Sequence, residues 1–271
     1  MAVAKASSNK AKIARRVIEV LDYFDDDHRE ATVMDIVRRY NRPQSSTSEL
    51  LSSLVELGLL YKDNYTRSYS LSPRAALLGA SGQNSTVRNG NLTRLLDRLS
   101  AQTGLSVALM GSVGLNSQII SWRSGARCTN AKTRALYAGM QEPLLNSAAG
   151  WLLLSTIAQP RCDGMVRRLN SEASEDQKVP FAEMSARIQR CRDTGAGMGP
   201  AGYGSGADMV SVLIPGQPAE HPLAVSLIYG PDSQISPDAL LACIQEAIEH
   251  CLQDEALPVP AASIEAFPTA A

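Results

Sequence analysis

The chain has 271 residues, of which 44% are hydrophobic and 20% charged, and its formal net charge is −1. These values allow one large or two modest domains with apolar cores, and they exclude a polybasic nucleic-acid binder. No apolar run is long enough to span a bilayer, and residues 1–9 lack the apolar segment of a signal peptide. We therefore expect a cytoplasmic protein that begins with a disordered tail.

The spacing of the cysteines and histidines predicts no metal site. The chain has five cysteines and three histidines, none at the spacing of zinc ligands, so reduced thiols are expected. No Ser–His or Cys–His pair and no clustered carboxylates predict catalysis. We therefore expect neither a cofactor nor an enzymatic activity. The residues in question are Cys128, Cys162, Cys191, Cys243, Cys251, His28, His221 and His250.

The first two elements expected along the chain are helices. Apolar residues recur at helical spacing from Ile13 to Phe24. In segment 31–40, Thr32 suits the N-cap position, and Asp35 three residues later completes a capping box. Only residues 41 and 42 separate this second helix from the next one.

A third helix is expected between Pro43, which suits the first helical position, and Gly58, which suits the residue after a helix end. Two short helices joined by so tight a turn predict a helix-turn-helix. Leucines form one face of the third helix, and short hydrogen-bonding side chains form the other, which can enter a DNA major groove. The alternative is an ordinary serine-rich surface helix. The polar face consists of Gln44, Ser45, Ser46, Ser48, Glu49 and Ser52.

Two short β-prone runs, 60–63 and 69–71, flank a polar tip and predict a hairpin, or wing. Lys62 and Arg67 stand where a wing would meet phosphate or the minor groove. Arg38, Arg42 and the basic residues of the first helix are also expected to contact phosphates, with a solvated face as the alternative. A recognition helix followed at once by a wing is a more specific indication of a DNA-binding domain than either part alone.

The second half of the chain predicts a separate α+β unit. A small polar segment at 80–86 is the expected linker, and leucines from 92 to 99 mark a helix that Gly104 ends. Strands are expected at 105–113, 118–122, 131–137, 209–214 and 223–229, and helices at 143–155, 161–170, 181–192 and 236–251. This order predicts a mostly antiparallel sheet. Residues beyond 254 are rich in Ala and Pro and are expected to be disordered.

A glycine-rich run covers residues 195–208. Gly197 to Gly202 fits the dinucleotide-binding pattern formally, but the predicted helix precedes it and the predicted strand follows it, whereas phosphate binding needs the reverse order. We interpret the run as a flexible loop bordering a ligand cavity, over which Tyr203 and Ser205 would close. A solvent loop without a role is the alternative.

Residues 10–79 resemble the winged helix-turn-helix of the IclR family of bacterial transcription regulators. The MarR family shares much of this pattern but has no second domain of the kind expected here. The matching residues are Pro43-Gln-Ser-Ser46, Leu50, Leu51, Leu54, Glu56-Leu-Gly-Leu59 and Tyr69-Ser-Leu71.

The second half resembles the GAF-like effector-binding module of the same family. In the family's loop before its central helix, Leu145 replaces a His and Trp151 replaces a Lys, whereas the other residues agree. The agreeing residues are Pro143, Leu144, Ser147, Ala148 and Gly150.

The resemblance implies a two-domain α+β fold. An N-terminal winged helix-turn-helix DNA-binding domain at 10–79 is joined by a linker and linker helix at 80–104 to a GAF-like α/β effector-binding domain at 105–253. Disordered tails are expected at 1–9 and 254–271.

The same resemblance implies a transcription regulator, either repressor or activator. Its partners would be double-stranded operator DNA, a small-molecule effector, and a second copy in a homodimer or a dimer of dimers. One alternative is a DNA-binding regulator whose C-terminal domain only oligomerises. Another is a small-molecule-binding or enzymatic protein whose N-terminal helices serve only contacts, against which the paired helix-turn-helix and wing argue.

The effector is expected between the sheet and the loop 139–150. Because Leu145 and Trp151 remove two polar groups from the motif, we expect a small, largely apolar or aromatic molecule with one or two polar groups. For the methionines and Trp122, a role in the core is the alternative. The expected lining residues are Met110, Ser112, Trp122, Met140, Asn146, Ser147, Tyr203, Met209 and Ser226.

Overall fold

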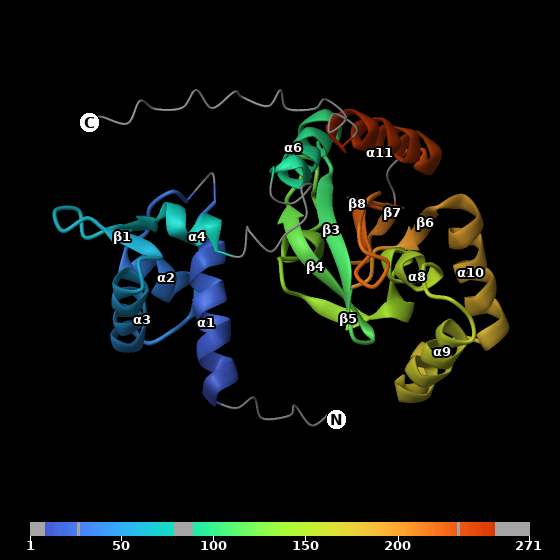
Figure 1. Ribbon diagram of the computed structural model, residues 1–271, viewed down its shortest axis with the longest axis horizontal. Coiled ribbons are helices and arrows are strands. Elements are labelled where there is room, and N and C mark those ends of the chain that lie inside the picture. Colours follow the sequence, from blue (N-terminus) through green and yellow to red (C-terminus); the bar gives the residue numbers. More distant parts are fainter. Residues whose placement is uncertain (1–8, 26–27, 79–88, 232–233, 253–271) are drawn as a thin grey trace, which may run out of the picture. The chain divides into compact units, whose positions relative to one another are not determined.

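The computed structural model describes residues 9–25, 28–78, 89–231 and 234–252. They divide into two compact units, unit 1 up to residue 88 and unit 2 from Asn89 onward (Figure 1). The expected tails, apart from residue 9, and the expected linker segment lie outside the described residues. None of the helices in the described parts is long and apolar enough to cross a membrane.

Unit 1 is a helix-turn-helix followed by a hairpin. The capping box expected at the second helix is present, because the Thr32 backbone N–H donates to the Asp35 carboxylate over 2.8 Å and the Asp35 N–H donates to the Thr32 hydroxyl over 3.4 Å. Asn41 then adopts a left-handed conformation with φ of 49° and turns the chain toward Pro43. The elements are α1 Asn9–Tyr23, α2 Val33–Tyr40, α3 Gln44–Glu56, β1 Leu60–Lys62, β2 Tyr69–Leu71 and α4 Pro73–Leu77.

An apolar core holds the helices of unit 1 to its hairpin. Leu51 and Leu54 of α3 are fully buried together with Ile36 of α2, and truncating such a residue typically costs about 2–5 kcal/mol. Tyr69 of β2 exchanges two backbone hydrogen bonds with Ala31, 3.0 and 2.8 Å long. Because Ala31 lies just before α2, this bridge attaches the wing to the helix-turn-helix.

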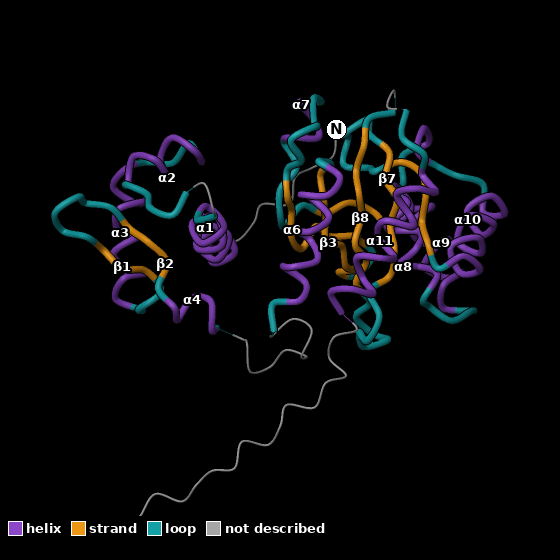
Figure 2. The backbone as a smooth tube through the Cα atoms, turned by 90° about the horizontal axis from the view of Figure 1, so that it is seen from above, coloured by secondary structure: helices purple, strands orange, loops and turns teal. Residues whose placement is uncertain are grey.

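Unit 2 is built on an antiparallel sheet of six strands in the order β5-β4-β3-β8-β7-β6. In Figure 2 these strands are enclosed by helices. The strands are β3 Ser106–Val113, β4 Asn116–Arg123, β5 Gln141–Pro143, β6 Ala196–Pro200, β7 Asp208–Leu213 and β8 Leu223–Tyr229. The helices are α6 Asn91–Thr103, α7 Ala131–Arg134, α8 Ala148–Ser155, α9 Arg161–Glu172, α10 Phe181–Thr194 and α11 Pro237–Leu252, with short 3₁₀ turns at Leu144–Asn146 and Glu175–Gln177.

Helices cover both faces of this sheet. Ala108 and Met110 of β3 are buried in one apolar cluster with Leu152 of α8. The alternating residues Val107 and Leu109 are also buried, and they face the side on which α6 and α11 pack. Burial on both faces explains why the central strands have near-continuous apolar sequences.

The prediction of a strand at 131–137 is wrong. Residues 131–134 form α7, whose start is capped by the Asn130 side chain accepting from the Lys132 N–H over 2.9 Å. The edge of the sheet beside β4 is formed instead by β5, where the sequence analysis placed only a loop. A local cap therefore prevailed over a weak β pattern.

The prediction of a loop throughout 195–208 is wrong for the first half of this segment. Residues 196–200 form the edge strand β6, in which Gly197 pairs with Ser211 of β7. A Cβ atom at Gly197 would lie 2.5 Å from the carbonyl oxygen of Ala148. The glycines of β6 therefore allow α8 to pack closely on the sheet, and only residues 201–207 form the loop.

Candidate functional sites

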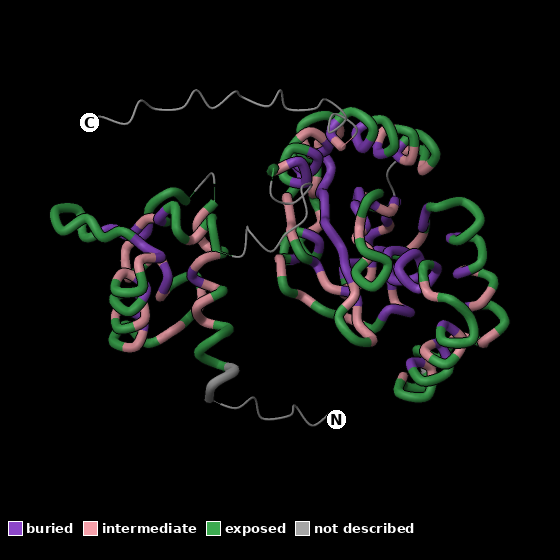
Figure 3. Tube along the Cα trace, in the orientation of Figure 1, coloured by how far each residue is buried: buried purple, intermediate pink, exposed green. Residues whose placement is uncertain are grey.

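The outer face of α3 is polar and open to solvent. Gln44, Ser45, Glu49 and Ser52 are exposed and Ser48 is partly exposed, whereas Leu51 and its apolar neighbours face the core. The outer turns of α3 are green in Figure 3. The face is free of bulky side chains, so it has the shape and chemistry needed to approach base edges in a major groove.

Ser46, expected on the same face, is engaged within unit 1. Its hydroxyl donates to the Pro43 carbonyl over 3.3 Å. The Arg16 guanidinium of α1 donates to the Ser46 carbonyl and hydroxyl over 3.0 and 3.2 Å. Ser46 therefore connects α1 to the first turn of α3, and its hydroxyl is less available to DNA than its position in the sequence suggests.

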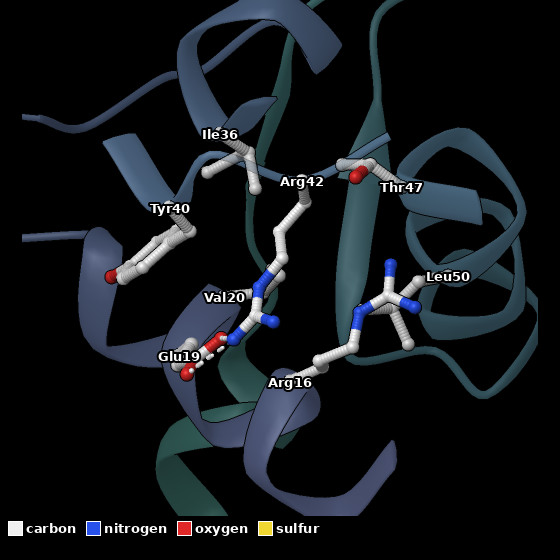
Figure 4. Close-up of a pocket in the computed structure, with 8 residues that line it drawn as sticks. All are labelled: Arg16, Glu19, Val20, Ile36, Tyr40, Arg42, Thr47 and Leu50. Atoms are coloured by element: carbon white, nitrogen blue, oxygen red, sulfur yellow. Dashed lines mark hydrogen bonds and ion pairs between the residues drawn. The ribbon is translucent and has the colours of Figure 1, made fainter. Parts of the chain in front are cut away.

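Arg42, expected to contact phosphate, forms an ion pair. Its guanidinium donates to both carboxylate oxygens of Glu19, each over 3.0 Å. Figure 4 shows this pair beside Arg16, around a pocket of about 10 Å³, which is the space of one water molecule. Glu19 thus neutralises the charge that was expected to contact phosphate.

A wider basic groove of about 560 Å³ opens between α1 and the start of α3. Its lining brings together basic residues that are separated by up to 30 positions in the chain. A groove lined by positive charges attracts an anionic partner. Arg38 and Arg39 lie exposed in the last turn of α2. The groove is lined by Lys12, Ile13, Arg15, Arg16, Arg42, Pro43 and Ser46.

The two basic residues expected on the wing are both exposed. The Lys62 ammonium lies 5.8 Å from the ring centroid of Tyr69. Arg67 adopts a left-handed conformation with φ of 57°. The wing therefore presents positive charge beyond the body of unit 1.

In unit 2, most of the residues expected at the effector site lie on or beside the sheet face that α8 covers. Met110 and Met209 are fully buried in the α8 cluster, against which Trp122, Met140 and Tyr203 pack. Ser226 is also fully buried, and its hydroxyl is 2.7 Å from that of Ser211. Ser147 is the buried N-cap of α8, accepting from the Gly150 N–H over 3.3 Å, and Asn146 and Ser112 are partly exposed.

A polar cluster that was not predicted from the sequence joins the loop 201–207 to the sheet edge. The Glu142 carboxylate accepts from the Tyr203 N–H over 2.6 Å, and the Tyr203 hydroxyl donates to the Ser117 carbonyl over 3.0 Å. Burial raises the pKa of Glu142 to about 7, against the lowering effect of the Tyr203 and Ser147 hydrogen bonds. Burial also raises the pKa of Tyr203. No sequence signal marked Glu142, because these contacts arise between distant segments.

The two substituted motif positions contact each other. The Trp151 indole N–H donates to the Leu145 carbonyl over 2.7 Å, and both side chains are buried. The Arg187 guanidinium lies 4.7 Å from the Trp151 ring centroid. Two buried, largely apolar side chains therefore replace the polar residues of the motif, with the indole N–H bonded to a backbone carbonyl and a cation on the ring.

Residues 14–64 match the family model of the IclR helix-turn-helix domain. The crystal structure of an IclR transcriptional regulator from Alicyclobacillus acidocaldarius is similar with a TM-score of 0.55 and 20% identity, covering 90% of this chain and 98% of that one. An IclR homolog from Microbacterium hydrocarbonoxydans, complexed with 4-hydroxybenzoate, has a TM-score of 0.56 and 16% identity, covering 89% and 99%. The effector domain of a putative IclR regulator from Acinetobacter sp. ADP1 has a TM-score of 0.55 and 22% identity, covering 62% and 98%. No curated protein matches the chain in sequence.

A helix-turn-helix with a wing, followed by an α/β unit with an antiparallel sheet, is the two-domain fold that this chain shares with those structures. Residues 14–64 therefore carry a helix-turn-helix domain of the IclR type, and the chain shares the fold of the solved IclR regulators. The expected fold class is thereby confirmed, and so is the expected IclR-type helix-turn-helix over residues 14–64.

Proposed function

We propose that the chain regulates transcription by inserting α3 into the major groove of operator DNA, as a homodimer or a dimer of dimers, and that unit 2 responds to a small molecule. The observation that carries the first part is the exposed polar face of α3, which starts at Gln44 and is held in place by buried leucines. Two-fold pairing is expected because one winged helix covers too little DNA for site selection. Sedimentation at micromolar concentration with operator DNA tests this, and a monomer contradicts it.

Replacing Gln44 with Ala is expected to weaken specific DNA binding by about 1–3 kcal/mol, because glutamine can form two hydrogen bonds with adenine. A gel-shift titration on a duplex selected by the wild-type protein from a random library measures the effect. Gln102→Ala is the matched control, since Gln102 is exposed on α6 in unit 2. Equal affinity of Gln44→Ala and wild type for the selected duplex contradicts the base contact.

Arg38→Ala and Arg67→Ala are each expected to reduce the slope of log affinity against log salt by about one unit, because each loses one phosphate contact. Arg42→Ala is expected to change the slope less, since Glu19 already pairs with its guanidinium. Titrations at several salt concentrations measure all three slopes. A full unit lost in Arg42→Ala would show that DNA displaces Glu19.

For unit 2 we propose a small aromatic or largely apolar effector with one or two polar groups, bound between the sheet and the segment 139–150. The buried side chains of Leu145 and Trp151 support an apolar site, and the Microbacterium homolog is complexed with 4-hydroxybenzoate. Calorimetry on the whole chain with 4-hydroxybenzoate and a sugar acid in parallel tests the class. Tight binding of the sugar acid contradicts it.

The second candidate is a regulator whose unit 2 only oligomerises. The observation that favours it is that the same two buried side chains fill part of the motif. A ligand that binds the folded state raises the melting temperature in proportion to the logarithm of its concentration. No such rise with any aromatic or sugar acid, together with intact dimers and operator binding, favours this second candidate.

A further inference from the structure

Basic and acidic residues are segregated along the chain of unit 2. From residue 98 to residue 141 the sequence has five basic residues and no acidic one, whereas residues 142–252 have thirteen acidic and seven basic residues. Four of the five cations fall within residues 123–134, the basic segment, which comprises the end of β4, the following loop and α7. Figure 2 shows α7 at the outer edge of unit 2. Positive charge concentrated in this way on an otherwise acidic unit attracts an anionic partner.

Three of these four cations have no acidic partner among the described residues. Arg123 pairs with the Asp97 carboxylate of α6 over 2.9 Å, so Asp97 neutralises its charge. Arg127, Lys132 and Arg134 are exposed, and the structure describes no carboxylate in an ion pair with any of them. The basic segment therefore presents three uncompensated positive charges to solvent.

Close packing fixes the first part of the basic segment on the sheet. Gly125 is buried, and an added Cβ atom there would overlap the carbonyl carbon of Leu105, just before β3. The Gly125 N–H donates to the Ser106 hydroxyl over 3.1 Å, and the Arg127 N–H donates to the Gly104 carbonyl over 2.9 Å. The backbone that carries Arg127 is thus held between the end of α6 and the start of β3.

Hydrogen bonds fix the second part of the basic segment. The Arg134 Nε–H donates to the Cys128 carbonyl over 2.6 Å, a bond that uses one of the five donors of its guanidinium. The Asn130 side chain accepts from the Lys132 N–H and donates to the Ser205 carbonyl, each over 2.9 Å. Cations held in place before a partner arrives lose less conformational entropy when they bind.

The side chains between the cations suit a phosphate backbone. Ser124 and Thr129 are exposed hydroxyl residues, and Ala126 and Ala131 are exposed and small. Phosphates of DNA are contacted by arginine, lysine and hydroxyl side chains. An acidic protein partner would be expected to use large apolar or aromatic anchors, and the basic segment exposes none. Among anionic partners, nucleic acid therefore fits this surface better than an acidic protein.

We propose that the basic segment of unit 2 contacts the phosphates of DNA that flanks the site bound by α3. The inference rests on the proposed DNA-binding function. Arg127, Lys132 and Arg134 supply the charge, and these contacts add affinity without sequence preference. Because both units belong to one chain, the contact of unit 2 follows that of unit 1 as an intramolecular step, which raises the affinity of the whole chain.

The test uses the whole chain and a duplex that the wild-type protein selects from a random library. This duplex is compared with a longer one, extended at each end by about two helical turns of arbitrary sequence. Wild type is expected to bind the longer duplex about ten-fold more tightly, with a salt slope steeper by about two to three units. The triple variant Arg127→Gln/Lys132→Gln/Arg134→Gln is expected to lose both gains and to bind the shorter duplex as wild type does.

Two further variants separate charge from structure. The triple variant Arg161→Gln/Arg168→Gln/Arg190→Gln is the matched control, because these arginines are exposed on α9 and α10 of the same unit. It removes the same charge and is expected to keep the gain from the longer duplex. Arg127→Lys/Arg134→Lys keeps the charge of the basic segment and is expected to keep the wild-type salt slope, since phosphate contact depends on charge.

Three results would overturn the inference. One is equal binding of both duplexes by wild type, and another is an undiminished gain from the longer duplex in the triple variant of the basic segment. In either case an acidic protein replaces DNA as the candidate partner. The third is loss of the gain in Arg127→Lys/Arg134→Lys, which would show that the structure of the segment matters and its charge does not. If wild type selects no duplex at all, the proposed DNA-binding function fails instead.

Discussion

Gly150→Ala is expected to destabilise unit 2 by at least about 4 kcal/mol, a loss of stability that few single substitutions cause. A Cβ atom at residue 150 would lie 2.0 Å from the carbonyl oxygen of Leu144 and 2.8 Å from its carbonyl carbon. Both are backbone atoms, so a side-chain rotation cannot relieve the overlap. The segment before α8 would have to move away from the helix, and with it the Ser147 cap.

The measurement is urea unfolding followed by tryptophan fluorescence. Both tryptophans of the chain, Trp122 and Trp151, lie in unit 2, so the signal reports this unit alone. Gly164→Ala is the matched control, because Gly164 is exposed in α9 with nothing within 4 Å of an added Cβ. Alanine there is expected to stabilise the helix by about 0.5–1 kcal/mol. Similar midpoints for wild type and Gly150→Ala would show that the approach of Leu144 to α8 is looser than described.

Glu142→Gln is expected to remove a pH dependence of stability between about pH 4.5 and 7. In the folded chain Glu142 keeps its proton up to about pH 7, whereas the unfolded carboxyl loses it near its ordinary value of 4.5. The folded state thus binds more protons in this window, so the free energy of unfolding falls as pH rises through it. The stabilising contribution is complete below about pH 4.5 and lost above about pH 7.

Glutamine is uncharged at every pH and still offers an oxygen to the Tyr203 N–H. The variant is therefore expected to exceed wild type in stability by about 2–3 kcal/mol at pH 8 and to match it near pH 4. Urea unfolding by tryptophan fluorescence at both pH values measures this. Glu249→Gln serves as control, since Glu249 is exposed on α11. A constant difference between Glu142→Gln and wild type at the two pH values would contradict the buried, protonated carboxyl.

This prediction also concerns the loop 201–207. Glu142 holds the Tyr203 backbone, and Gly202 packs so closely on the carboxylate that an added Cβ would overlap it. Ionisation of Glu142 therefore places an incompletely compensated charge under this loop, where one carboxylate oxygen is buried without a partner among the described residues. The loop is the part of unit 2 in which opening with pH is expected to begin.

Local signals in the sequence were sufficient to predict an element wherever that element carries residues that mark its own start and end. The Thr32–Asp35 capping box marks α2, and the left-handed glycines at 58 and 104 follow α3 and α6, as expected. Helical spacing of leucines assigned the inner and outer faces of α3 before any contact was known. The helix-turn-helix, the wing and the likeness of residues 14–64 to the IclR helix-turn-helix domain could therefore be predicted from residues close together in the chain.

Tertiary structure alone decided which of the predicted groups are free to act. Arg42 and Ser46 look alike as surface polar residues, yet Glu19 and Arg16, some 23 and 30 positions earlier, engage them. The glycines of β6 look like a loop until the close approach of α8 is seen, and Glu142 acquires its raised pKa only when the loop 201–207 covers it. Hydrogen bonding and desolvation depend on neighbours in space, and distant segments supply those neighbours, so no local pattern encodes them.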